Sequence, residues 1–146
     1  MAASQKYSGE SLFEKISGQF VDGTKTENIP ERERRVKSIS EHLWRMFNTR
    51  QGSVPHLDDY GLPDITEVYR NLPDSLLQLE KSILKLTHKY EPRLEKVTVR
   101  PIPVDALEFK LSFELSATIK GGERIRFKTS FESSGKTDVS PQSIRV

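Results

Sequence analysis

The segment LEFKLSFELSATI, residues 107–119, decides the fold of this chain. Successive side chains of a β-strand point to opposite faces of the sheet, so strict alternation of apolar and polar residues is typical of a strand with one buried face. The apolar positions are Leu107, Phe109, Leu111, Phe113, Leu115, Ala117 and Ile119. All of the positions between them are charged or carry a hydroxyl group. We therefore expect an antiparallel strand whose apolar face is covered by another layer.

The residues on either side of this segment extend the sheet. Gly121 and Gly122 follow it and supply the positive φ angles that a tight hairpin turn requires. Alternation continues beyond the turn, and a shorter alternating stretch precedes the segment. These patterns predict an antiparallel sheet of three or four strands, with outer strands at about 94–100 and 123–130.

The outer strands of such a sheet leave one row of backbone N–H and C=O groups unpaired unless another element covers it. On the strand at 123–130, the pattern places Arg126 on the face away from the core, and Phe127 and Thr129 on the other face. Unpaired edges bind extended segments of partner proteins. We therefore expect the strand that carries Arg126, Phe127 and Thr129 to be an edge that accepts a partner strand.

Helices are expected before the sheet. Proline is tolerated in a first helical turn, and an acidic residue beside it complements the positive end of the helix dipole. This signal occurs three times, and apolar residues recur at helical spacing after it, which predicts helices at 30–49, 63–69 and 74–90. Pro92 forces Glu91 out of the helical region and ends the last helix.

Helices followed by strands indicate an α+β fold, with the N-terminal helices packed on one face of the C-terminal sheet. We expect a single domain at residues 29–132. Residues 1–28 are expected to form a flexible segment with one short docking helix, because a few apolar residues recur there at helical spacing. Residues 133–146 are expected to be a C-terminal tail.

Composition excludes several classes of protein. The 146 residues contain 23 Lys and Arg, 21 Asp and Glu, and no Cys. The absence of Cys excludes disulfide frameworks, thiolate metal sites and a cysteine nucleophile. The net charge of +2 is far from the concentrated basic stripe that nucleic-acid binding requires. Neither a secretory signal nor an apolar run long enough to cross a membrane is visible, so we expect a cytoplasmic protein with no nucleic-acid partner and no membrane insertion.

Searches for a catalytic or metal site find little. His42, His56 and His88 do not have the spacing of metal ligands, so no metal or cofactor is expected. Asp58 and Asp59 are adjacent carboxylates in a loop rich in Pro and Gly, where a solvated pair is the usual arrangement. No nucleophile elbow occurs either. We therefore expect a protein that is not an enzyme.

Three short motifs remain: FNTRQG at 47–52, YGLPD at 60–64 and YEPRL at 90–94. Taken alone, Glu91 and Arg93 are an ion pair at an exposed corner between a helix and a strand, which contributes about 0 to 1 kcal/mol. In their order and spacing, however, the motifs resemble TssE proteins, the type VI secretion baseplate subunits of the gpW/phage-wedge "lysozyme-like" family. The resemblance covers about residues 10–132.

This resemblance implies a cytoplasmic wedge protein that joins the subunits TssF and TssG at the place where the contractile sheath starts to polymerise. It also implies that Glu91, Pro92 and Arg93 make polar contacts with neighbouring subunits, and Arg50 and Tyr60 complete the candidate partner-binding set. The edge strand at 123–130 would then accept an arm of the first sheath subunit.

Two other functions are considered. The name "lysozyme-like" suggests a muramidase, but a glycosidase needs two carboxylates across a groove, one with a raised pKa, and Arg93 beside Glu91 lowers its pKa. The same fold also resembles anti-adaptor proteins, which block a proteolysis adaptor. This regulatory binding role is the alternative to a wedge subunit.

Overall fold

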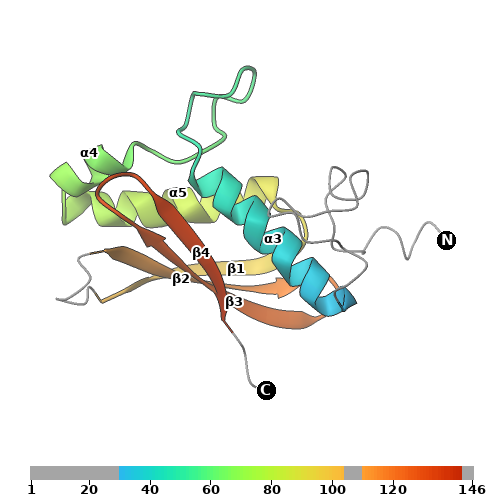
Figure 1. Ribbon diagram of the computed structural model, residues 1–146. Helices are drawn as coiled ribbons and strands as arrows, with labels where there is room; N and C mark the ends of the chain where they lie inside the picture. Colours follow the sequence, from blue (N-terminus) through green and yellow to red (C-terminus); the bar gives the residue numbers. More distant parts are fainter. Residues whose placement is uncertain (1–29, 104–109, 143–146) are drawn as a thin grey trace.

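Three helices cover one face of a four-stranded antiparallel sheet (Figure 1). The structure is a computed structural model that describes residues 30–103 and 110–142. The elements are α3 (Glu31–Phe47), α4 (Ile65–Arg70), α5 (Asp74–Tyr90), β1 (Leu94–Ile102), β2 (Leu111–Ile119), β3 (Glu123–Phe131) and β4 (Thr137–Gln142). Strands follow one another in the order β1-β2-β3-β4, so every connection joins neighbours. The expected α+β fold is confirmed.

The helix boundaries follow the proline signals. Helix α3 begins directly after Pro30, and α5 begins directly after Pro73. Glu91 adopts φ −120° and ψ 82°, outside the helical region, so α5 ends immediately before it, as Pro92 predicts. Asp64 caps α4, because its side chain accepts a hydrogen bond from the backbone N–H of Thr66 at 3.0 Å.

The core lies between the helices and the apolar face of β2 and β3. Phe113, at the centre of β2, has no exposed surface, and its ring meets Phe131 of β3 edge to face with 5.9 Å between the centroids. The helical side of the core is formed by Ile39, Leu43, Met46, Leu79, Ile83 and Leu86. The predicted faces of β2 are therefore confirmed from Leu111 to Ile119, while Leu107, Phe109 and the expected docking helix of residues 1–28 lie outside the described residues.

The prediction that β3 is an edge strand is wrong. Strand β4 pairs antiparallel with β3, from Phe131 opposite Thr137 to Arg126 opposite Gln142. Phe127 and Thr129 are fully buried on the core face of an inner strand, so a proline there would break the interior of the sheet. Residues 137–142 thus form a strand inside the segment expected to be a tail.

Within residues 30–103 and 110–142, the outer strands of the sheet are β1 and β4. Strand β1 has an irregular register between Glu95 and Thr98, where Lys96 adopts a positive φ of 52°, and it carries Pro101 near its end. Strand β4 carries Pro141. Bulges and prolines are devices by which edge strands avoid uncontrolled pairing. Both outer strands therefore carry features that limit pairing with further strands.

The face of the sheet opposite to the helices is polar. Arg126 lies there, as predicted, and its guanidinium is 3.7 Å from the carboxylate of Glu114. Arg100 of β1 donates to the same carboxylate at 2.6 Å. Hydrogen bonding from Arg100 and the two positive charges hold the pKa of Glu114 below its ordinary value. On this face, Glu114 therefore joins β1, β2 and β3 through ion pairs with Arg100 and Arg126.

Candidate functional site

The first two sequence motifs lie side by side. The backbone N–H of Gln51 donates to the carbonyl of Leu62 at 2.8 Å, and the N–H of Leu62 donates to the carbonyl of Thr49 at 2.9 Å. Arg50 and Leu62 thereby form a short parallel bridge. The residues between the two strands of this bridge form a loop that projects beyond the helical layer (Figure 1). The motifs therefore close the base of an exposed loop.

Gly61 makes this close approach possible. Its φ is +106°, a conformation that side chains disfavour, and an added Cβ would lie 2.5 Å from the carbonyl oxygen of Thr49. Real Cβ atoms essentially never show so short a contact with a backbone oxygen. The glycine of the second motif is therefore required by the backbone of the first.

We expect Gly61→Ala to lower the free energy of unfolding by about 2 to 3 kcal/mol, because the new methyl group forces the two backbones apart. Gly52→Ala is the matched control, since Gly52 also has a positive φ of +88° but nothing lies within 4 Å of its added Cβ. Urea denaturation of both variants measures the difference. Equal losses in both would show that the contact with Thr49 does not matter.

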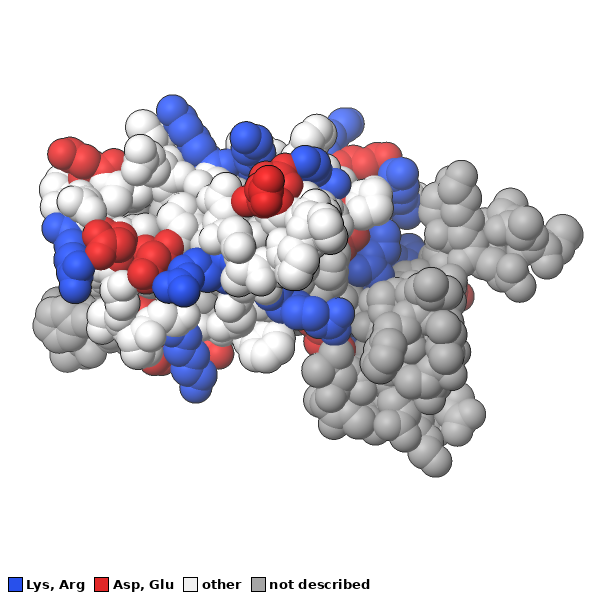
Figure 2. All heavy atoms as spheres, turned by 90° about the horizontal axis from the view of Figure 1, so that it is seen from above, with Lys and Arg blue, Asp and Glu red and all other residues white. Residues whose placement is uncertain are grey.

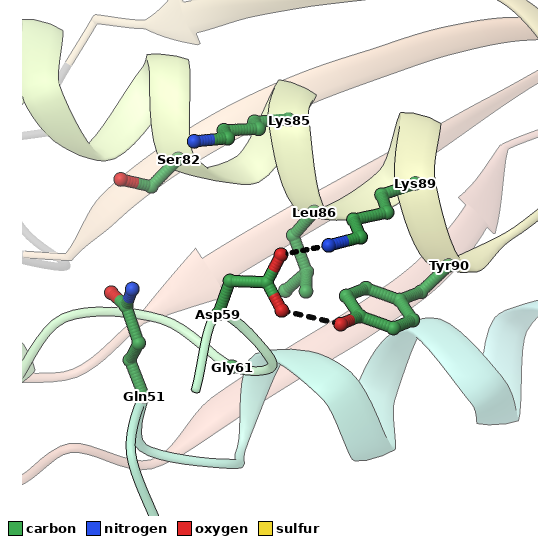
Figure 3. Close-up of a pocket in the computed structure, with 8 residues that line it drawn as sticks. All are labelled: Gln51, Asp59, Gly61, Ser82, Lys85, Leu86, Lys89 and Tyr90. Carbon is green, nitrogen blue, oxygen red and sulfur yellow. Dashed lines mark hydrogen bonds and ion pairs between the residues drawn. The ribbon is translucent and has the colours of Figure 1, made fainter. Parts of the chain in front are cut away.

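The third motif anchors the same loop from α5. The hydroxyl of Tyr90 donates to Asp59 at 2.5 Å, and Lys89 forms an ion pair with the other oxygen of that carboxylate (Figure 3). The rings of Tyr60 and Tyr90 meet edge to face at 5.0 Å. Hydrogen bonds from Lys89 and then Tyr90 lower the pKa of Asp59. Asp59 is thus an ionised anchor of the loop, where the sequence suggested a solvated carboxylate.

A pocket of about 110 Å³ lies between this loop and α5 (Figure 3). It is lined by Gln51, Asp59, Gly61, Ser82, Lys85, Leu86, Lys89 and Tyr90. The Asp59 carboxylate is already neutralised by Lys89, and hydrogen bonding to Asp59 raises the pKa of Tyr90. Neither group is therefore suited to proton transfer near neutral pH. The pocket is therefore a recess lined mainly by polar groups.

Glu91 is buried, contrary to the expectation of an exposed corner. Its side chain is 1% exposed and accepts two parallel hydrogen bonds from the guanidinium of Arg93, each 2.8 Å long. The backbone N–H of Arg93 donates to the same carboxylate at 3.1 Å. The pair lies within the protein because helix α3 covers it. The estimate of 0 to 1 kcal/mol for an exposed pair therefore does not apply.

Helix α3 completes this network. Nδ1 of His42 lies 2.7 Å from the Glu91 carboxylate, and Arg93 donates to the hydroxyl of Ser38 at 2.8 Å. Burial raises the pKa of Glu91, but the hydrogen bonds from Arg93 and His42 and the positive charge of Arg93 outweigh it and lower the pKa to about 2. Glu91 is therefore an ionised structural group that joins the end of α5 to α3.

The other predicted site residues differ in exposure. The Arg50 side chain is 71% exposed and lies 3.8 Å from Asp64, while Tyr60 is half-buried against Tyr90. Pro92 is exposed. The structure thus brings Tyr60 close to the third motif, whereas Arg126, Phe127 and Thr129 lie in the sheet and not at this site.

Asn48 lies in the first motif, but the sequence assigned no role to it. Its side-chain amide donates to the carbonyl of Thr137 at 3.2 Å and accepts from the N–H of Thr137 at 3.2 Å. This pair of hydrogen bonds attaches the start of β4 to the end of α3. Asparagine after a helix signals a helix end, but nothing in the sequence indicates a partner 89 residues away.

The geometry at Glu91 does not fit glycoside cleavage. The general acid of a glycosidase needs a raised pKa and access to substrate, and Glu91 has neither. Within residues 30–103 and 110–142, no three His, Asp or Glu side chains cluster in a way that could hold a metal ion. None of the helices in the same ranges is long and apolar enough to span a membrane.

Comparisons with known proteins identify the family of the chain. The chain is 31% identical over 70 residues to baseplate wedge protein gp25 of Enterobacteria phage T4; the match covers 47% of this chain and about half, 53%, of that relative. A chain in the baseplate complex from the type VI secretion system is 28% identical, with a TM-score of 0.55, and the likeness covers 81% of this chain and all of that one.

The structure of a candidate tail lysozyme from Geobacter sulfurreducens is 18% identical to this chain, with a TM-score of 0.48. The likeness covers 76% of this chain and 92% of the lysozyme chain. The family model of baseplate wedge protein gp25 matches residues 33–123, which include all three motifs. The resemblance that these motifs carry is therefore confirmed. The chain belongs to the gp25 family of baseplate wedge proteins.

Proposed function

We propose that this chain is a structural subunit of a type VI secretion baseplate, in which it binds TssF and TssG and helps to start assembly of the contractile sheath. Support for a type VI secretion system comes from a chain of its baseplate complex, which is 28% identical to this chain and is covered over its whole length. In this role the protein works in the cytoplasm, at the inner face of the inner membrane.

The observation that carries the proposal is the construction of the loop between α3 and α4. Three separate motifs hold it in place through Gly61, the Tyr90 to Asp59 hydrogen bond and the backbone bridge at Leu62. Loops fixed by a rigid scaffold are common binding elements in proteins. We infer that the base of this loop presents Arg50 and Tyr60 to wedge partners.

Glu91 and Arg93, which are joined to α3 through His42 and Ser38, have different proposed roles. Glu91 has almost no exposed surface, so it acts by fixing Arg93, whose side chain is 22% exposed. Pro92 is exposed beside it. We propose that Pro92 and the exposed part of Arg93 touch a neighbouring subunit, and that Glu91 positions them. The low pKa of Glu91 supports a structural role and not hydrolysis of cell-wall glycan.

Co-purification tests the proposed function. We expect the tagged chain, co-expressed with TssF and TssG of the same system, to recover both subunits. Arg50→Glu should reduce that recovery at least tenfold, about 1.4 kcal/mol, because an exposed cation in the interface is reversed in sign. Circular dichroism should remain that of the unchanged protein.

Arg70→Glu is the matched control, because the Arg70 side chain is 73% exposed and its ion pair is with Glu67 of the same helix, α4. Recovery should stay near that of the unchanged protein. Failure of the unchanged chain to recover TssF and TssG would reject the proposed function. Equal recovery with both variants would remove Arg50 from the interface.

A further inference from the structure

The outer side of α5 carries exposed leucines. Leu77 is 56% exposed and Leu84 is 38% exposed, whereas Leu79, Ile83 and Leu86 of the same helix are buried. Positions seven residues apart lie on one side of a helix, two turns from each other. Leu77 and Leu84 therefore form a short apolar row that points away from the core.

Lysines accompany this row. Lys81 lies between the leucines at helical spacing, and Lys85 is one turn further along. Within the described residues neither lysine forms an ion pair with a carboxylate, while Lys89 is neutralised by Asp59. Glu80 is the nearest acidic residue in sequence, and it is half-buried on the flank of the helix. Lys81 and Lys85 therefore place positive charge between and beside the two leucines. Figure 2 shows the helical side of the molecule, where blue Lys and Arg side chains lie among white, uncharged ones.

The polar pocket borders this row. Figure 3 shows Lys85 and Ser82 at one side of the pocket and Gln51, from the projecting loop, across it. An ammonium group, a hydroxyl and a side-chain amide are all hydrogen-bond donors. The recess also holds the Asp59 carboxylate, whose charge Lys89 neutralises. On the Lys85 side, next to the leucines, its donors therefore suit a carboxylate from outside the chain.

We propose that the outer row of α5, formed by Leu77, Lys81, Leu84 and Lys85, docks an acidic amphipathic helix of another wedge subunit. Apolar residues of that helix cover the two leucines, since helices recognise one another through residues at such spacing. Asp or Glu residues beside them pair with Lys81 and Lys85. This charge complementarity favours an acidic partner over a second copy of the chain, whose own row is cationic.

The proposal rests on membership of the wedge, so its test uses the same co-purification of the full chain with TssF and TssG. Leu77→Gln combined with Leu84→Gln should reduce recovery at least tenfold, because Gln keeps the helix but removes the apolar contact. Leu72→Gln is the control, since Leu72 is 37% exposed in the connection between α4 and α5, outside both the docking row and the projecting loop. If the unchanged chain fails to recover the subunits, the proposed function is wrong. If it recovers them and the double variant does so equally, the docking row is wrong.

Charge reversal tests the acidic character of the partner. Lys81→Glu with Lys85→Glu should abolish recovery. Lys96→Glu with Lys128→Glu makes the same change in net charge on strands β1 and β3, and it should leave recovery near that of the unchanged protein. Losses of equal size in both pairs would show a general charge effect and reject the specific contact.

Cross-linking identifies the occupant. The chain has no cysteine, so Leu84→Cys provides a single attachment site for a thiol-linked photo-cross-linker in the assembled complex. We expect the label to join an acidic helical segment of another wedge subunit. Cross-links to a second copy, to a basic or non-helical segment, or to nothing in the recovered complex would overturn the proposal.

Discussion

Phe113→Ala is expected to lower the free energy of unfolding by about 3 to 5 kcal/mol. The side chain has no exposed surface, and its ring contacts Phe131 at 5.9 Å across the sheet. Truncation leaves a cavity that the surrounding strands and helices cannot fill, because the core is packed at the density of a crystal. Since small domains are stable by only about 5 to 15 kcal/mol, little folded protein should remain at physiological temperature.

Thermal melting and circular dichroism measure this effect. Leu77→Ala is a useful control, because Leu77 is 56% exposed and its truncation in the isolated chain should change stability by less than about 1 kcal/mol. A melting temperature of Phe113→Ala within a few degrees of the unchanged protein would show that β2 does not present this face to the helices.

Glu91→Gln is expected to destabilise the fold by about 3 to 5 kcal/mol, because it leaves the largely buried Arg93 without its charged partner. This expectation reverses the one from sequence, in which an exposed pair could be removed at little cost. Arg100→Gln is a matched control at a surface ion pair, where the arginine side chain is 72% exposed. Similar losses in both variants would contradict a special role for burial at Glu91.

Glu91 also makes the free energy of unfolding depend on pH. The pKa of Glu91 is about 2 in the folded protein and 4.5 in its ordinary state, so the unfolded chain binds the proton more tightly. The resulting contribution of about 3 kcal/mol is fully present above about pH 5 and is lost as the pH falls toward 2. Urea denaturation at pH 6 and pH 3 should show a smaller pH effect in Glu91→Gln than in the unchanged protein. An equal effect in both would assign the pH dependence to other carboxylates.

The strands differ in how clearly the sequence predicted them. Strand β2 was evident because five of its nine residues alternate as buried apolar side chains. Strand β4, with the sequence TDVSPQ, is polar and contains a proline, so it has no such pattern. Its partner is β3, and that pairing depends on backbone hydrogen bonds and on Asn48, neither of which leaves a periodic trace in sequence. The wrong assignment of β3 as an edge follows from that one missing strand.

The candidate site was predictable in its parts but not in its arrangement. Proline after Glu91 correctly placed the end of α5, since it acts on the neighbouring residue alone. The burial of Glu91 depends on Ser38 and His42, which lie on a different helix about fifty residues earlier. Only the packing of α3 against the corner turns a local ion pair into an internal network. Long-range contacts of this kind set burial, and a single sequence does not encode them as a pattern.

The two hydrogen bonds between Asn48 and Thr137 affect the order in which the parts of the chain fold. These hydrogen bonds join residues that are 89 positions apart, so most of the domain must be synthesised before they can form. Contacts of high sequence separation carry a large loop-closure entropy, and they slow folding. During synthesis on the ribosome, Asn48 is therefore made long before its partner Thr137, and β4 is the last of the described strands to be made. Until then β3 is an open edge, which makes the nascent chain most vulnerable to aggregation just before its last strand is added.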